Sequence, residues 1–104
     1  MADVRLSPQA VNDLTEIKAY ISDELCDPIA AERIVKKIIN DYSLLEISPF
    51  MGPELSALTH IKSDYRYLVC GKYIVFYKVE ESFVSIYRIL YGARDYLKVL
   101  FGEI

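Results

Sequence analysis

Hydrophobic and polar positions follow a helical period through the first quarter of the chain. Between residues 8 and 25, apolar side chains recur every three or four residues and form one stripe. The members of this stripe are Ala10, Leu14, Ile17, Ile21 and Leu25. The polar residues Asn12, Asp13, Glu16 and Ser22 fall mostly outside it. Ser7-Pro8 suits the start of such a helix, because serine caps helices and proline fits the first helical position.

A second amphipathic helix follows directly. Asp27-Pro28 repeats the start signal, and the helix ends before Pro49, since the residue that precedes a proline avoids helical angles. Its apolar stripe is wider than the first and consists of Ala31, Ile34, Val35, Ile38, Ile39, Tyr42 and Leu45. Because only two or three residues separate the two helices, the pattern predicts a helical hairpin.

The second half of the chain is rich in β-branched and aromatic residues. Three runs, at 65–70, 73–79 and 83–90, are separated by the short turns Gly71-Lys72 and Glu80-Glu81-Ser82. Turns this short predict antiparallel neighbours.

The remaining segments complete the predicted fold. Val4-Arg5-Leu6 can form a short first strand, residues 48–63 are predicted to be a loop, and residues 94–101 a short C-terminal helix, with a strand as the alternative. We therefore predict an α+β fold in a single domain, residues 1–104. An N-terminal helical hairpin packs on a three- to four-stranded antiparallel sheet, and a short C-terminal helix follows.

Composition excludes several classes of function. Cys26 and Cys70 are distant in sequence and are interpreted as small apolar residues, and the single histidine, His60, leaves a zinc site without a ligand set. We predict no metal and no cofactor. No apolar run approaches the ~18 residues that would span a membrane. The start of the chain does not resemble a signal peptide, so we expect a cytoplasmic protein.

The charge balance argues against a nucleic-acid binder. The chain has 12 Lys and Arg against 15 Asp and Glu, a net charge of −3. Proteins that bind polyanions usually present a basic surface, although a local basic face is compatible with an acidic total.

Two motifs in the chain carry a family resemblance. The C-terminal one reads Arg66-x-Leu68-x-x-Gly71-x-Tyr73-x-Val75-x-Tyr77-x-Val79, then Val84-x-Ile86-x-Arg88-Ile89-Leu90-Tyr91-Gly92-Ala93-Arg94-Asp95. The N-terminal one reads Leu6-Ser7-Pro8-x-Ala10-x-x-Asp13-Leu14-x-x-Ile17-x-x-Tyr20-Ile21, followed by Ala30-Ala31 and Pro49-x-x-Gly52. Their order and spacing resemble the RelE/ParE superfamily of bacterial toxins, and the upstream half is closer to the ParE side.

This resemblance implies a toxin of a type II toxin–antitoxin system, neutralised by a cognate antitoxin encoded alongside. It also implies one of two mechanisms. RelE-like members cut mRNA inside the ribosome, without a metal. ParE-like members inhibit DNA gyrase and are not enzymes.

The residues favour the second mechanism. By the resemblance, Arg66 and Arg94 match basic positions of RelE-like nucleases, whereas Leu68, Ile74 and Leu100 replace two basic residues and a tyrosine. Losing such groups removes the phosphate contacts and proton transfers that RNA cleavage requires. We predict a ParE-like inhibitor. The alternatives are a metal-independent mRNA endonuclease that uses Arg66 and Arg94, and a non-toxic module that only binds a partner.

The contacts with the antitoxin or the target are predicted on the strand half and the tail. The candidates are Arg66, Arg88, Arg94, Asp95, Tyr96, Leu97, Leu100 and Phe101. Two of them also have a structural interpretation: Arg66 as a solvent-facing strand residue, and Arg88 as the partner of an acid such as Asp95. Because the tail is more apolar than a short helix can bury, we expect the antitoxin's C-terminal segment to cover it and the adjacent sheet, as a strand or a helix in a groove.

Overall fold

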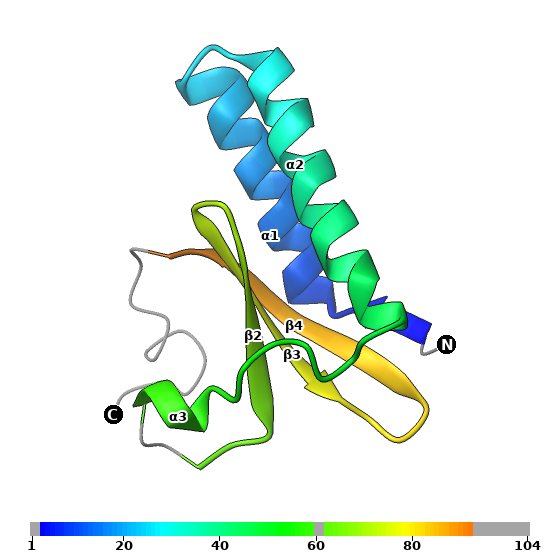
Figure 1. Ribbon diagram of the computed structural model, residues 1–104. Helices are drawn as coiled ribbons and strands as arrows, with labels where there is room; N and C mark the ends of the chain where they lie inside the picture. Colours follow the sequence, from blue (N-terminus) through cyan, green and yellow to red (C-terminus); the bar gives the residue numbers. More distant parts are fainter. Residues whose placement is uncertain (1–2, 60–61, 93–104) are drawn as a thin grey trace.

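A computed structural model describes residues 3–59 and 62–92 of the chain. Two long helices form a hairpin that packs on a four-stranded sheet (Figure 1). In chain order the elements are β1 (Asp3–Leu6), α1 (Pro8–Ala19), the π-helical turn η1 (Tyr20–Glu24), α2 (Pro28–Ser43), the 3-10 turn η2 (Leu44–Glu46), α3 (Ser56–Thr59), β2 (Tyr65–Cys70), β3 (Tyr73–Val79) and β4 (Phe83–Tyr91). The predicted α+β class is confirmed, and the predicted C-terminal helix lies outside the described residues.

Both helices begin where the sequence predicts. The Ser7 side chain accepts a hydrogen bond of 3.0 Å from the Ala10 amide, and Asp27 accepts one of 3.0 Å from Ala30. Each cap satisfies an amide that has no partner inside its own helix. The predicted run to residue 25 continues past α1 as the π-turn η1. Cys26 then turns the chain with φ +52°.

The sheet has the order β1-β4-β3-β2 and is mixed. β2, β3 and β4 form the predicted antiparallel meander. β1, in contrast, lies parallel to β4, with Asp3 opposite Phe83 and Leu6 opposite Ile86. The prediction of an entirely antiparallel sheet is therefore wrong for the pair formed by β1 and β4. Because β1 is parallel to β4, α1 can start at the end of β1 and return along the sheet. No local turn in the sequence specifies this strand direction.

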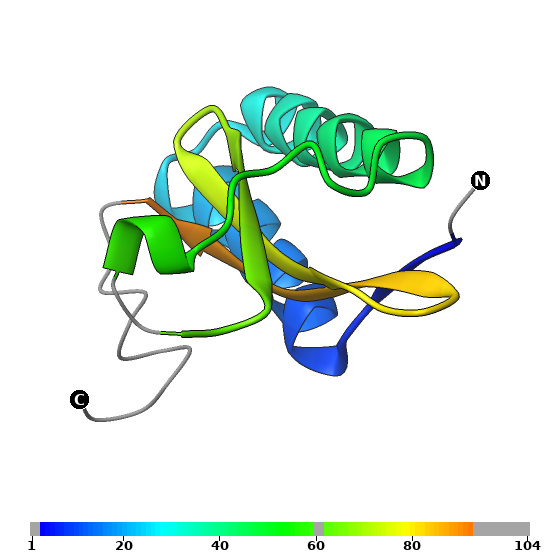
Figure 2. The same ribbon diagram turned by 60° about the horizontal axis from the view of Figure 1, so that its bottom comes forward.

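Apolar side chains cover both faces of the sheet. On the hairpin side, residues of α1, α2 and η2 pack on Val75, Tyr77, Val84 and Ile86. On the other side, Leu55 packs on Phe76 and Leu90. The segment that connects α2 to α3 runs alongside β2 and so brings Leu55 to that face (Figure 2). Within the described residues, no helix is long and apolar enough to cross a membrane.

Candidate partner-binding site

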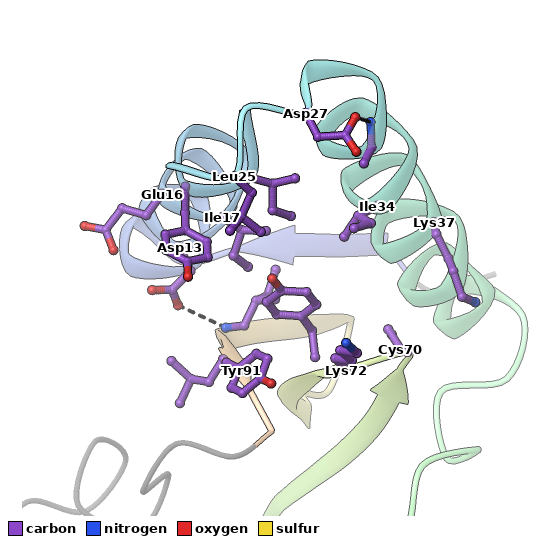
Figure 3. Close-up of a pocket in the computed structure, with 17 residues that line it drawn as sticks. Asp13, Glu16, Ile17, Leu25, Asp27, Ile34, Lys37, Cys70, Lys72 and Tyr91 are labelled. Carbon is purple, nitrogen blue, oxygen red and sulfur yellow. Dashed lines mark hydrogen bonds between the residues drawn. The ribbon is translucent and has the colours of Figure 1, made fainter. Parts of the chain in front are cut away.

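An open groove of about 860 Å³ separates the helical hairpin from the adjacent ends of β2, β3 and β4. Its helical wall carries Ile17, Ile21, Leu25 and Ile34, and its floor carries Cys70, Tyr73, Leu90 and Tyr91. Figure 3 shows the hairpin residues on one side, with Cys70 and Tyr91 facing them from β2 and β4 and Lys72 from the turn between β2 and β3. The groove exists because the tip of the hairpin projects beyond the sheet (Figure 1).

The mouth of this groove exposes large apolar side chains. Leu25 is 57% exposed, Tyr20 54% and Tyr91 48%. Tyr91 also stacks edge-on against Tyr73, with ring centroids 5.8 Å apart. Contiguous exposed apolar surface on a small protein marks a site of interaction. The groove is therefore the best candidate for the surface that a partner covers.

A buried ion pair joins α1 to β4 at one end of the groove. Asp13 is only 4% exposed and accepts three hydrogen bonds. Two come from Arg88, Nε at 2.8 Å and Nη2 at 2.9 Å, and one from the Ile89 amide at 3.0 Å. The hydrogen bond to Asp13 raises the pKa of Arg88. Both oxygens of the carboxylate thus accept hydrogen bonds, and these bonds hold α1 against β4.

Asp13 is the site residue that the sequence pattern missed. The prediction that Asp13 lies mostly outside the apolar stripe is wrong, because Asp13 follows the buried Ala10 by three residues and precedes Ile17 by four. That spacing puts it on the inner face of α1. The acid that pairs with Arg88 is therefore Asp13, and the suggested partner Asp95 lies outside the described residues.

Lys37 is another charged group of the groove that has a partner. Lys37 donates a hydrogen bond of 2.9 Å to Asp41, which raises the pKa of Lys37. Nearby, burial raises the pKa of the Cys70 thiol to about 12, so this cysteine stays protonated and is a poor nucleophile. In the part of the chain that the structure describes, no three His, Cys, Asp or Glu residues gather as a metal site.

Arg66 lies on β2, separated from Arg88 by β3. Its Nη1 donates to the carbonyl of Gly52 at 2.7 Å and to that of Phe50 at 3.4 Å. Nη2 lies 3.7 Å from the Glu54 carboxylate, and the guanidinium packs over the Phe50 ring. The side chain is only 21% exposed. The interpretation of Arg66 as simply solvent-facing was wrong, because the side chain holds the loop that precedes α3.

The remaining predicted positions divide into two groups. Leu68 packs on the core beneath the hairpin, and Ile74 on the core of the opposite face. The predicted contact residues Arg94, Asp95, Tyr96, Leu97, Leu100 and Phe101 lie outside the described residues. The structure therefore gives Arg66 and Arg88 separate structural partners and does not bring them together in one site.

Comparison with known proteins identifies the family. A family model described as "ParE toxin of type II toxin-antitoxin system, parDE" matches residues 4–96. The chain belongs to the ParE toxin family. It is the toxin component of a type II toxin–antitoxin system, and its partner is a cognate antitoxin.

The structural comparison agrees with the ParE fold. A solved chain from "Chromosomal ParDE TA system from P. aeruginosa" superposes with a TM-score of 0.74 at 19% identity. The match covers 88% of this chain and 96% of that one. At this identity the likeness establishes the shared fold. Among curated proteins, no sequence similar to this chain was found.

Proposed function

We propose that this ParE-family toxin arrests growth in the cytoplasm by binding DNA gyrase, and that it acts as an inhibitor rather than as an enzyme. The observation that supports this most is that Leu68 and Ile74 are aliphatic, partly buried and packed against the two cores. RelE-like nucleases have basic residues at the matching positions. Aliphatic side chains offer a phosphate neither a positive charge nor a hydrogen-bond donor.

The contacts of the Arg66 side chain support the same conclusion. Its guanidinium already donates to Gly52 and Phe50 and faces Glu54. A phosphate would have to displace these contacts. Each positioned acid or base contributes ~10²–10⁴-fold to catalysis, so a site that lacks several of them cleaves RNA poorly. Inhibition through a protein–protein surface needs none of these groups.

We further propose that the antitoxin neutralises the toxin by covering the groove between the hairpin and β4. A segment that filled the groove would bury Tyr20, Leu25 and Tyr91. Tyr96, Leu97, Leu100 and Phe101 follow Tyr91 in the sequence and remain candidates for the same contact. Arg94 and Asp95 are candidates for contacts with the antitoxin or the target.

Two assays separate this function from its alternatives. Purified toxin is expected to block gyrase supercoiling, and added antitoxin to restore it. Expression in cells should arrest growth, with relief by co-expressed antitoxin. Normal growth at high levels of folded toxin would instead support an inert binding module.

The nuclease alternative has its own readout. Primer extension on translated mRNA after induction should reveal no new 5′ ends. Discrete ends within codons, abolished by Arg94→Ala, would refute the gyrase proposal and make this toxin an endonuclease. Asp95→Ala is the matched control, because it changes the neighbouring residue and leaves the arginine in place.

A further inference from the structure

The tip of the helical hairpin, residues 20–32, projects beyond the sheet and exposes apolar side chains (Figure 1). Every residue from 23 to 29 is exposed. Ile29, in the first turn of α2, is 80% exposed, and Leu25 is 57% exposed. Exposed apolar side chains gathered in this way mark an interaction surface. Ile29 is not part of the groove lining, so this surface extends beyond the groove.

Hydrogen bonds fix the backbone of the hairpin tip. The Leu25 amide donates to the Tyr20 carbonyl at 3.2 Å, which closes the π-helical turn η1. The Asp27 amide donates to the Ile21 carbonyl at 3.1 Å, and Cys26 between these turns has a left-handed conformation with φ +52°. π-helical turns and left-handed residues other than glycine are uncommon and often occur at functional sites. A tip held in this way loses little conformational entropy when a partner binds.

Charge indicates which kind of partner this surface fits. Residues 20–32 contain no lysine, arginine or histidine and four carboxylates, those of Asp23, Glu24, Asp27 and Glu32. The tip thus carries −4 in a chain of net charge −3, so the rest of the chain sums to +1. None of the four carboxylates forms an ion pair with another described residue. The acidity of the protein is therefore concentrated at the hairpin tip, and the complementary surface is basic.

We propose that the hairpin tip binds the basic surface on which gyrase holds DNA, and that it inhibits the enzyme by competing with DNA there. This inference rests on the proposed function, in which gyrase is the target. An enzyme that acts on DNA neutralises phosphates with lysine and arginine, so it presents such a surface. The carboxylates of Asp23 and Glu24 take the place of phosphates, and Leu25 and Ile29 add apolar contacts. DNA itself is a polyanion and would be repelled by the tip.

Displacement of DNA from purified gyrase tests the competition directly. A fluorescently labelled duplex bound to gyrase has a high anisotropy, because the complex tumbles slowly. Added toxin should release the duplex and lower this anisotropy at the concentrations that inhibit supercoiling. An anisotropy that stays high while supercoiling is fully inhibited would overturn the proposal, because toxin and DNA would then bind to gyrase at the same time.

Two pairs of substitutions with the same change in charge provide a matched comparison. Asp23→Asn with Glu24→Gln removes two charges from the tip, and Glu80→Gln with Glu81→Gln removes two from the exposed turn between β3 and β4. Half-inhibition of supercoiling should require about threefold to thirtyfold more of the tip pair, the range expected for two charge contacts. The turn pair should inhibit as the unchanged toxin does. Ile29→Gln should weaken inhibition about threefold to tenfold through the lost apolar contact.

Antitoxin binding and circular dichroism show whether these variants still fold. Asp23, Glu24 and Ile29 lie outside the groove lining, so their variants should bind antitoxin with unchanged affinity. If the unchanged toxin inhibits gyrase and the two charge pairs are equally effective or equally weakened, the tip proposal is overturned and the proposed function stands. A tip pair that loses antitoxin binding together with inhibition would also overturn it, because the substitutions would then act on the whole hairpin. If the unchanged toxin does not inhibit gyrase, the proposed function itself fails.

Discussion

Asp13 is the residue on which the contact between helix and sheet most depends. It lies in α1, 75 residues before Arg88, and it is nearly inaccessible to water. A buried carboxylate is costly to desolvate, and here three donors offset that cost. Removing one partner of such a pair leaves the other charge buried without compensation.

We therefore expect Asp13→Ala to lower the free energy of unfolding by about 3–5 kcal/mol. Urea denaturation followed by circular dichroism measures this change. The double variant Asp13→Leu with Arg88→Met should lose less, because it buries no unpaired charge. Its remaining cost would come from the Ile89 amide, which loses its acceptor. A double variant as unstable as Asp13→Ala would contradict this account.

At the scale of elements, β2 and β3 clamp the loop that joins η2 to α3. The Gly52 amide donates to the buried Tyr77 hydroxyl at 2.9 Å, and the Gly52 carbonyl accepts from Arg66 at 2.7 Å. The Tyr67 amide donates to Pro53 at 3.1 Å. A Cβ on Gly52 would lie 2.3 Å from the Tyr67 carbonyl oxygen and 2.6 Å from the Tyr77 hydroxyl. Only glycine fits at this position, because the neighbouring carbonyl is backbone and cannot rotate away.

Gly52→Ala is accordingly expected to destabilise the fold by about 1–3 kcal/mol, as overpacking of a tight site does. The comparison is Gly71→Ala in the β2–β3 turn, where an added Cβ meets nothing within 4 Å but φ is +62°. That substitution should cost about 1 kcal/mol from backbone strain alone. Gly52→Ala should also disturb the aromatic resonances of Tyr77, whereas Gly71→Ala should not. Unchanged Tyr77 resonances in both variants would argue against the clamp.

For the whole molecule, the packed tyrosines and Cys70 connect stability with pH. Burial raises the pKa of Tyr42, Tyr65, Tyr73 and Tyr77 above the ordinary value of 10.0. It raises that of Cys70 from 9.0 to about 12. The folded state thus favours the protonated forms. Their contribution to stability is complete below the unfolded-state values and is lost as pH rises through the folded-state values.

The free energy of unfolding should therefore not fall on account of these groups below about pH 9, and it should decrease between about pH 9 and 12. Urea denaturation at a series of pH values measures the decrease, and near-ultraviolet absorbance of tyrosinate follows the ionisation. In Cys70→Ala the decrease should begin nearer pH 10, where the tyrosines titrate. Constant stability up to pH 12 would show that these groups are not buried as the structure has them.

The sequence by itself determined the two long helices, the strands of the meander and the family, whereas the short helix α3 lies in a segment predicted to be a loop. The helix stripes, the Ser7 and Asp27 caps and the glycine turn at Gly71 depend on neighbours within about four residues, so they can be recognised before any fold is known. The motifs that resemble ParE toxins are also recognised from the order and spacing of residues along the chain, and the family match over residues 4–96 confirms the resemblance.

Only the tertiary structure decided how distant segments meet. The parallel direction of β1, the partners of Arg66, and the pairing of Asp13 with Arg88 join residues that lie 14 to about 80 positions apart. The groove arises in the same way, because α1 follows the edge of β4 as far as Asp13 and then leaves it. The periodic spacing of apolar residues indicates which face of a helix or strand is buried. It carries no information on which segment covers that face, since that depends on the packing of the entire chain.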